Sequence, residues 1–428
     1  LGYAAFEIMV SVFFCCILIF IVFAPKMRAL SERLNVVSLS GFLAIRYKSN
    51  GFRLLCGTLV SVMMVPYAIS AMKGNAMHAI VGIPYVMGVV VIALVSFCYL
   101  VTAGYWGVST TDIIQGITIA VSCLLVAVIV ITKSGGVTEA VTYMGSVSPS
   151  HIRPSSGLTF AQLFSWAGVW ALIAFGQPQL VTKFMGLKDS RTVGTVMRVA
   201  VIWEIVFMVS IAMIGAAAFK LFGAVPFDNV DAIVPTLVAE HTNAVVSGIF
   251  LCGILAAGLS TTVALVLTSS GAVTKDIYED YYCIRGHAKQ DSGKSVRISR
   301  AATGIILVVV VIGAIYPPDF IWSLSTMSAG VMGAAFTAPL VLGLYWKRAT
   351  RQGCMAGIIG GSAISIIWYF AGLTSVVHSF VPGTAVSFLL MVMVSFCTPE
   401  MEKEHLDVFF EPGCSKDKIQ AAIAAGNK

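Results

Sequence analysis

Long apolar runs recur along the whole chain and constrain its fold more than any other feature. The segment 110–132, for example, contains Asp112 as its only charged residue. A helix needs about 20 apolar residues to cross a bilayer, and several runs reach that length. They lack the alternation of barrel strands, and only helices or closed barrels satisfy every backbone group in lipid. The sequence therefore predicts an all-α, polytopic membrane protein.

The composition excludes a soluble globular protein. Hydrophobic residues make up 58% of the 428 positions and charged residues only 11%, whereas soluble domains carry about 25% charged residues. The net charge of +7 is compatible with a nucleic-acid partner, but the basic residues cluster between the apolar runs, as the positive-inside rule describes. We therefore expect the lipid bilayer as a partner and no nucleic acid.

The length criterion predicts about eleven transmembrane helices. They are expected near residues 3–25, 53–78, 83–103, 110–132, 158–182, 199–223, 244–274, 299–316, 319–345, 353–372 and 379–397. Residues 1–398 then form one transmembrane domain, and residues 399–428 form a short polar tail. The chain begins with Leu1 rather than Met, so we expect its native N-terminus to lie further upstream.

The loops after the first, fifth, seventh and ninth predicted helices are basic, and they lie on one side if every helix crosses once. Their basic residues are Lys26, Arg28, Arg33, Arg46 and Lys48; Lys183, Lys188 and Arg191; Lys275, Arg285, Lys289, Lys294 and Arg297; and Lys347, Arg348 and Arg351. The opposite loops, 133–157 and 224–243, are poor in Lys and Arg and include Asp228, Asp231 and Glu240. The positive-inside rule therefore predicts a multi-pass protein of the plasma or inner membrane with a cytoplasmic C-terminus.

No catalytic or cofactor-binding motif stands out. The chain has no phosphate-binding Gly-rich loop, no His-Glu-x-x-His and no Gly-x-Ser-x-Gly segment, so hydrolysis and phosphoryl transfer have no visible machinery. Its ten cysteines include no Cys-x-x-Cys pair, and those inside apolar runs are typical of small buried membrane residues. We therefore predict neither an enzyme nor a cofactor, which leaves transport across the membrane or sensing.

The seventh predicted helix carries three small residues on one face. Ala257, Ser260 and Thr261 stand at positions i, i+3 and i+4, which share a helical face. Hydroxyl and carbonyl oxygens can bind a partly dehydrated sodium ion without burying a large charge. The alternative is small-residue helix packing, which also favours Gly, Ala, Ser and Thr and is the more common reason for such a pattern.

Other positions also have both a functional and a structural interpretation. Asp112, at the start of the fourth predicted helix, is either an ion-pathway carboxylate or a helix cap. Pro178, after Trp170 in the fifth predicted helix, either breaks that helix to form a binding site or only kinks it. Tyr67 is either a pocket wall or a residue of the interfacial aromatic belt. Glu204, near the start of the sixth predicted helix, is expected to contact water or headgroups.

Four segments, in order, resemble the sodium:solute symporter family, whose members take up proline, pantothenate, sugars and other small solutes. Residues 109–116 are similar to the family's Trp-Thr-Asp-x-x-Gln segment, with Ser-Thr-Thr replacing the usual start. Residues 175–185, Phe-Gly-Gln-Pro-Gln-Leu-Val-Thr-Lys-Phe-Met, resemble its proline transporters. Residues 254–278 are similar to its sodium-site helix, and residues 317–318, Pro-Pro, together with 342–353 resemble its pantothenate branch. The resemblance covers essentially the whole chain.

The resemblance implies a LeuT-like fold of two inverted five-helix repeats with extra flanking helices. The first predicted helix here corresponds to the second helix of the first repeat. We therefore expect this LeuT-like fold to lack its first helices, including the broken helix that normally supplies backbone carbonyls to the sodium site and part of the solute cavity.

The resemblance also implies the ligands of sodium, the expected co-transported ion. Ala257, Ser260 and Thr261 match sodium ligands, and Asp112 matches a carboxylate linked to sodium binding or exit. The ordered motifs favour a sodium site over helix packing at this segment, because several motifs in order are less common by chance than a single one. Hydroxyl ligands also suggest Na⁺ rather than H⁺ as the coupling ion.

Tyr67, Trp170 and Pro178 match positions implicated in substrate binding in the proline branch. Where those transporters have Tyr, this chain has Ala174, which puts proline as the substrate in doubt. The implied function is sodium-coupled uptake of a small organic solute, such as the amino acid proline or the carboxylate pantothenate, by alternating access. The alternatives are a transporter-like sensor module of a signalling protein, against which the short tail argues, and an inactive truncated remnant.

Overall fold

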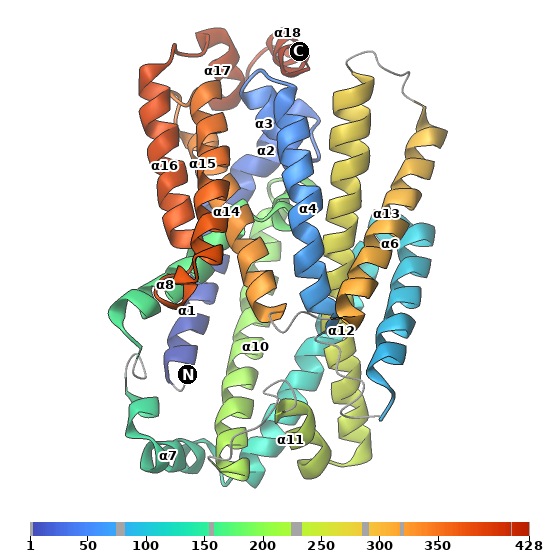
Figure 1. Ribbon diagram of the computed structural model, residues 1–428, viewed down its shortest axis with the longest axis vertical. Helices are drawn as coiled ribbons and strands as arrows, with labels where there is room; N and C mark the ends of the chain where they lie inside the picture. Colours follow the sequence, from blue (N-terminus) through green and yellow to red (C-terminus); the bar gives the residue numbers. More distant parts are fainter. Residues whose placement is uncertain are drawn as a thin grey trace.

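The computed structural model describes residues 3–73, 82–153, 158–223, 233–284, 291–316, 321–411 and 413–427. These residues form helices with short connections, and no β-strand occurs among them. Figure 1 shows the long helices running side by side along one axis, as expected for an all-α membrane protein. The Pro-Pro pair 317–318 and the loop residues Asp228, Asp231, Arg285 and Lys289 lie outside the described residues.

The helices of the first half of the chain are α1 (Tyr3–Leu18), η1 (Ile19–Phe23), α2 (Ala24–Leu34), α3 (Leu39–Arg46), α4 (Gly51–Lys73), α6 (Tyr85–Lys133), α7 (Val137–Val147), η2 (Pro149–Ile152), α8 (Phe160–Leu172), η4 (Ile173–Gly176), α9 (Pro178–Met185) and α10 (Thr192–Phe222). Those of the second half are α11 (Ile233–His241), α12 (Ala244–Gly271), η6 (Ala272–Cys283), α13 (Ser292–Ile315), α14 (Ile321–Tyr345), α15 (Arg351–Phe370), η7 (Leu373–Ser375), α16 (Phe380–Cys397), α17 (Lys403–Phe410) and α18 (Lys416–Gly426). Within the described part of the chain, ten stretches are long and apolar enough to cross a membrane, and Phe160–Gly176 is a shorter apolar one. Together they match the predicted set of about eleven.

Helix α6 differs from the prediction because it continues through the segment where we expected a loop between two helices. It still contains two apolar stretches of spanning length, Tyr85–Thr102 and Gly107–Lys133. Asp112 therefore lies inside a continuous helix. The interpretation of Asp112 as a helix cap is wrong, because no helix begins there.

The predicted fifth span consists of two helices joined by a break. Helix α8 ends at Leu172, a short 3-10 turn follows, and Gln177 is extended before α9 begins at Pro178. Proline is favoured at the first position of a helix, because that position needs no backbone amide hydrogen. Gly176 allows the break to contact α14, since a Cβ atom there would lie 2.8 Å from the Cα atom of Gly333. The proline therefore separates two helices rather than kinking one.

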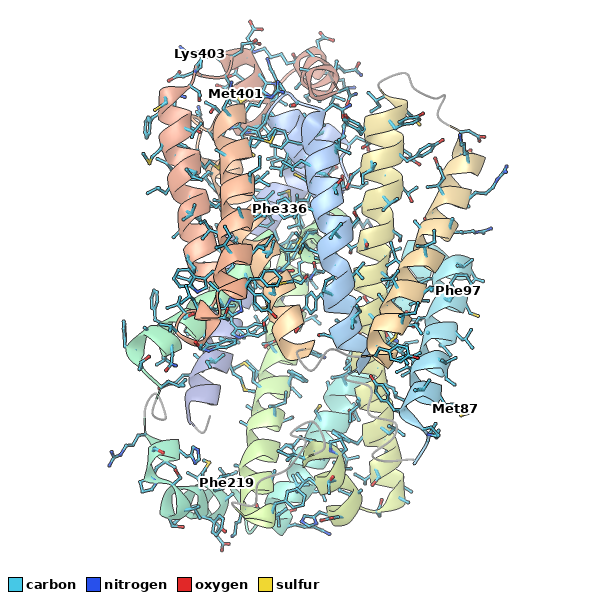
Figure 2. The ribbon with its side chains drawn as sticks, viewed as in Figure 1. Met87, Phe97, Phe219, Phe336, Met401 and Lys403 are labelled. Atoms are coloured by element: carbon cyan, nitrogen blue, oxygen red, sulfur yellow. The ribbon has the colours of Figure 1, made fainter. Side chains whose placement is uncertain are left out.

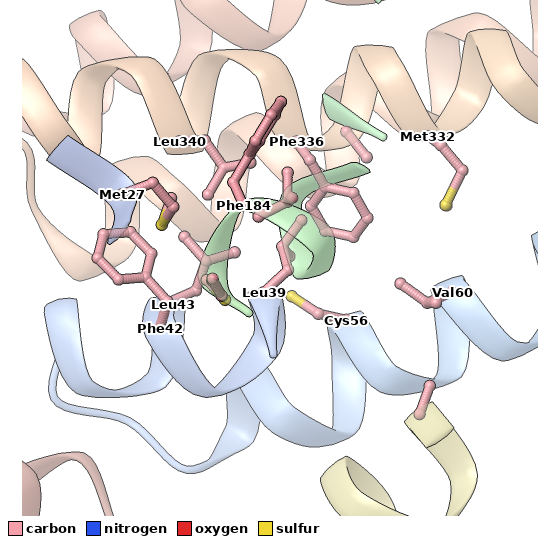
Figure 3. Packing of buried hydrophobic residues seen from close by; sticks show 14 of the residues in the cluster. Met27, Leu39, Phe42, Leu43, Cys56, Val60, Phe184, Met332, Phe336 and Leu340 are labelled. Atoms are coloured by element: carbon pink, nitrogen blue, oxygen red, sulfur yellow. The ribbon is translucent and has the colours of Figure 1, made fainter. Parts of the chain in front are cut away.

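Helix α14 is at the centre of the protein. In its span Ser325–Tyr345, 83% of the most apolar 18-residue stretch is buried inside the protein. In the other candidate spans of the described chain, this buried share is at most 39%. Figure 3 shows Phe336 and Leu340 of α14 close to Met27 and to Phe184 of α9. Burial of these side chains holds the broken segment and α2 against the central helix, since burying a large apolar side chain contributes about 1.5–3 kcal/mol.

The outer helices present apolar side chains to the surroundings. On α6, Ile113, Ile114 and Ile117 are each at least 60% exposed, and Met87, which is 59% exposed, lies at the outer edge of the molecule in Figure 2. Large exposed apolar surfaces are unusual on soluble monomers. This pattern fits a helix bundle whose solvent is the hydrocarbon core of a bilayer.

The basic loops lie together at one end of the molecule, as predicted from the sequence. Arg28 donates a hydrogen bond to the carbonyl of Lys188 at 2.9 Å, which joins the loops after the first and fifth spans. Lys275 lies 3.1 Å from Asp280, which in turn faces Arg53 at 3.6 Å. In Figure 1 this end carries α17 and α18, while α7 and α11 lie at the opposite end.

The C-terminal tail is folded onto this basic end rather than extended. Helix α17 packs over α3, where the fully buried Arg46 side chain donates to the carbonyls of Gly343 at 2.9 Å and Trp346 at 3.3 Å. A ring nitrogen of His405 lies 3.2 Å from the Arg46 carbonyl. Gly426 of α18 contacts the backbone of α3 closely, because a Cβ atom there would lie 2.6 Å from the Cα atom of Ile45.

Candidate functional site

Three adjoining cavities, of about 290, 390 and 510 Å³, meet at helix α9. Gln179 and Lys183 lie one turn apart on α9, and both line all three cavities. We did not predict this arrangement from the sequence, where Lys183 has the pattern of an ordinary basic loop residue. The signal was available in the spacing: the two polar residues stand at i and i+4 directly after the helix-breaking Pro178.

The 290 Å³ cavity brings together three of the four predicted sodium residues. It is lined by Ser260 and Thr261 of α12, by Asp112 of α6 and by Tyr67 of α4. Ala257 does not line it; its carbonyl instead accepts a hydrogen bond from the Ser260 hydroxyl at 3.1 Å. The cavity thus has two hydroxyls and a carboxylate on its wall, which are the oxygen donors that a small hard cation requires.

Only one of the two carboxylate oxygens of Asp112 has a partner among the described residues. One of its carboxylate oxygens, Oδ2, lies 3.0 Å from the Nζ atom of Lys183. The other, Oδ1, is buried and has no hydrogen-bond partner among the described residues. A buried acceptor without a partner costs about 1–3 kcal/mol. A cation in the cavity would therefore find an available carboxylate oxygen, and it would compete with Lys183 for the carboxylate charge.

The 510 Å³ cavity lies on the other side of Tyr67. Its wall includes Trp166 and Trp170 of α8 and Ala174 of the broken segment. Tyr67 is shared with the 290 Å³ cavity, so the two cavities have one aromatic side chain in common. The small side chain of Ala174 leaves room beside Trp170 on this wall. The predicted solute residues Tyr67 and Trp170 are therefore together.

Pro178, the third predicted solute residue, does not line the 510 Å³ cavity with Tyr67 and Trp170. It lines the 390 Å³ cavity together with Asp112, on the side that leads toward α3. The far end of that cavity carries the buried Asp276, whose carboxylate accepts a hydrogen bond from the Ser38 hydroxyl at 2.6 Å. Ser38 is also the N-cap of α3. The 390 Å³ cavity therefore connects the sodium residues with the basic end of the molecule.

Glu204 corrects one expectation of the sequence analysis. We expected it near the end of a span, in contact with water or headgroups, because the helix was predicted to begin at residue 199. Helix α10 begins at Thr192 instead, so Glu204 lies about three turns inside it. Its side chain lines the 510 Å³ cavity. The boundary error of seven residues concealed a carboxylate at membrane depth.

A broken helix between apolar spans, with cavities on both sides of it that each carry a few polar side chains, is typical of a membrane transporter whose binding sites lie within the bundle. The chain belongs to the sodium:solute symporter family, whose model matches residues 1–361. It is 27% identical over 393 residues to the high-affinity proline transporter PutP of Bacillus subtilis, covering 90% of this chain and 82% of that protein. It is also 27% identical over 403 residues to a sodium/proline symporter of Staphylococcus aureus, covering 89% and 76%.

The solved structures include a similar fold. A Na⁺-coupled sialic acid symporter, in a substrate-bound outward-open state, superposes with a TM-score of 0.74 over 93% of this chain and 84% of that one, at 18% identity. This likeness supports the predicted LeuT-like fold. The family resemblance stated from the four motifs is confirmed, and the relatives are transporters rather than enzymes or sensors.

Proposed function

We propose that this protein imports a small organic solute together with Na⁺ by alternating access. The observation that carries the proposal is the shared wall: Ser260, Thr261 and Asp112 surround one cavity, and Tyr67 separates it from a larger aromatic cavity. Two ligands that share a wall residue can each change the other's affinity, and thermodynamic linkage makes that change reciprocal.

In this mechanism Na⁺ binds between α6 and α12. The ligands are the hydroxyls of Ser260 and Thr261 and the free Oδ1 atom of Asp112. The Ala257 carbonyl either keeps the hydrogen bond from Ser260 or coordinates the ion. Since Asp112 also lines the 390 Å³ cavity, the ion leaves along that cavity past Pro178. Drawing α6 and α12 together stabilises one state of the transporter, and loss of Na⁺ releases it.

The solute binds in the 510 Å³ cavity against Tyr67 and Trp170. A volume of this size lies within the range of about 300–1,000 Å³ for small-molecule sites. The relatives are named as proline transporters, so an amino acid such as proline is the solute to test first, with the carboxylate pantothenate as the second. Ala174 widens the cavity relative to the tyrosine expected from the family resemblance, so solutes larger than proline also fit.

The test is uptake of radiolabelled proline and pantothenate into proteoliposomes, in sodium and in choline buffers. Ser260→Ala and Thr261→Ala should each raise the Na⁺ concentration for half-maximal uptake about tenfold, which corresponds to 1.4 kcal/mol of lost ion binding. Ser247→Ala on the same helix lies outside all three cavities and should leave that concentration unchanged. Unchanged sodium activation in both site variants would remove the sodium assignment.

Two substitutions on α8, one at the cavity wall and one as its control, test the solute assignment. Trp170→Ala should raise the apparent KM of the solute, because the variant loses cavity wall. Phe164→Ala removes an aromatic ring from the exposed side of α8, where it is 60% exposed, and should not affect uptake. Equal kinetics in the two variants would contradict the role of Trp170.

We also propose that the basic end faces the cytoplasm, because basic loops are retained on that side. The end that carries α17 and α18 would then be cytoplasmic in the plasma or inner membrane. A reporter fused after Lys428 that fluoresces only in the cytoplasm tests this. A dark fusion, with normal amounts of protein in the membrane, would reverse the orientation.

A further inference from the structure

Glu204 is a carboxylate at membrane depth that the proposed mechanism does not use. It lies about three turns inside α10, with Ile202 and Ile205 beside it in the sequence, and its side chain lines the 510 Å³ cavity. It forms no hydrogen bond or ion pair with any residue that the structure describes. Ionisable residues inside membrane spans are costly, and they usually mark a substrate or ion pathway.

No basic group pairs with Glu204 on the described part of the cavity wall. Lys183 is the other charged residue on the described part of the wall, and its ammonium group already lies 3.0 Å from Asp112. His378 is neutral: its Nδ1 atom accepts a hydrogen bond from the amide of Phe380 at 3.1 Å, and burial lowers its pKa to about 4. Among the described residues of the wall, Glu204 is therefore the one carboxylate, and it has no ion-pair partner.

The remaining polar and aromatic groups of the wall suit a cation. Trp166, Trp170 and Tyr67 all line the same cavity as Glu204. The faces of aromatic rings attract ammonium groups by about 0.5–2 kcal/mol each, most strongly where water is excluded. A carboxylate with aromatic rings around a common space is the chemistry that recognises an organic ammonium ion, and it repels an organic acid without an amine.

We propose that Glu204 binds the amine of the transported solute, so that the solute class is small organic molecules with a protonated or quaternary amine. This inference rests on the proposed function, because it concerns the same 510 Å³ cavity and names the chemistry of its occupant. It selects amino acids and related zwitterions, and it excludes a simple carboxylate such as pantothenate. Glu204 then determines specificity, while Ser260 and Thr261 determine ion coupling.

The test separates the two charges of proline with two ring compounds of similar size. Pyrrolidine keeps the ring amine and lacks the carboxylate, and cyclopentanecarboxylate keeps the carboxylate and lacks the amine. Binding of each compound to the purified protein in nanodiscs is measured by isothermal titration calorimetry at pH 7.5 in sodium buffer, which requires no transport. We expect pyrrolidine to bind and cyclopentanecarboxylate to bind at least tenfold more weakly.

Three variants identify the residue responsible. Glu204→Gln keeps the shape and removes the charge, and it should weaken pyrrolidine binding at least tenfold. Glu204→Asp keeps the charge and should retain most of the affinity. Glu240→Gln makes the same change on an exposed residue of α11, outside all three cavities, and should have no effect.

The outcomes distinguish this inference from the proposed function. Unchanged pyrrolidine binding in Glu204→Gln, no pyrrolidine binding to the unaltered protein, or tighter binding of cyclopentanecarboxylate would each overturn the role of Glu204, even if uptake depends on sodium. Conversely, if pyrrolidine binding depends on Glu204 but uptake shows no sodium dependence, the amine site stands and the symport proposal fails.

Discussion

Acidification should loosen the C-terminal tail through a single buried histidine. His405 of α17 is 5% exposed, and burial lowers its pKa from the ordinary 6.5 to about 4. The hydrogen bond to the Arg46 carbonyl opposes this shift, and the nearby charges of Lys48 and Arg46 add to it. Its third charged neighbour, Glu402, is paired with Lys48 at 2.6 Å, and that lysine lowers the pKa of the Glu402 carboxyl.

The magnitude follows from the two pKa values. In the docked tail His405 is neutral down to a pH of about 4, whereas in an undocked tail it takes up a proton below about 6.5. Stability that is fully present above pH 6.5 is therefore lost as the pH falls toward 4. Between pH 7.5 and 5.0 the docking free energy should fall by about 2 kcal/mol, which is about a thirtyfold increase in the opening equilibrium.

Hydrogen exchange of residues 401–411 in nanodiscs measures this opening, with rates corrected for the intrinsic effect of pH. His405→Gln is the control, because the glutamine amide can still donate to the Arg46 carbonyl but does not titrate. The reasoning is refuted if the unaltered protein has equal protection at both pH values. It is also refuted if the glutamine variant shows the full thirtyfold change, since another group would then be responsible.

Two further variants test the centre of the molecule. Lys183→Gln should lower the Na⁺ concentration for half-maximal uptake about two- to fivefold. In this variant Na⁺ no longer competes with the Lys183 ammonium for Asp112, and a partly exposed ion pair of this kind is worth about 0.5–1 kcal/mol. An unchanged or higher concentration would mean that Asp112 does not bind the ion. Gly176→Ala should lower the free energy of unfolding by about 1–3 kcal/mol, as overpacking does, because the added Cβ atom meets the backbone of α14. Gly168→Ala, where a Cβ atom meets nothing within 4 Å, is the control in a thermal melt, and equal melting temperatures would contradict the close approach.

The sequence predicted most of the helices, because a bilayer accepts little else from long apolar runs. It did not predict the continuity of α6, because the length criterion divided this segment into two spans, 83–103 and 110–132, with a loop between them. Backbone groups exposed by such a loop would lack partners in lipid, and a continuous helix avoids that cost. The break before Pro178 was predicted as one of two interpretations, and the contact of Gly176 with α14 explains why the break prevailed.

The candidate site was only partly visible in the sequence. Local periodicity predicted one face for Ala257, Ser260 and Thr261, but only Ser260 and Thr261 line the common cavity. The pairing of Asp112 with Lys183 joins residues 71 positions apart, and no local pattern encodes it. Glu204 was missed for a different reason: the apolar window located α10 but not its true start, and the end of a helix depends on its neighbours.

The buried Arg46 also determines the order in which the protein can be assembled. Its guanidinium acceptors, the carbonyls of Gly343 and Trp346, follow 297 and 300 residues later in the chain. At roughly 5–20 residues per second, a ribosome needs roughly 15–60 s to reach them. During that interval the Arg46 guanidinium has to stay hydrated, so a chaperone or the insertion machinery has to leave it in contact with water. The basic end of the bundle therefore closes last, after nearly the whole chain has been synthesised.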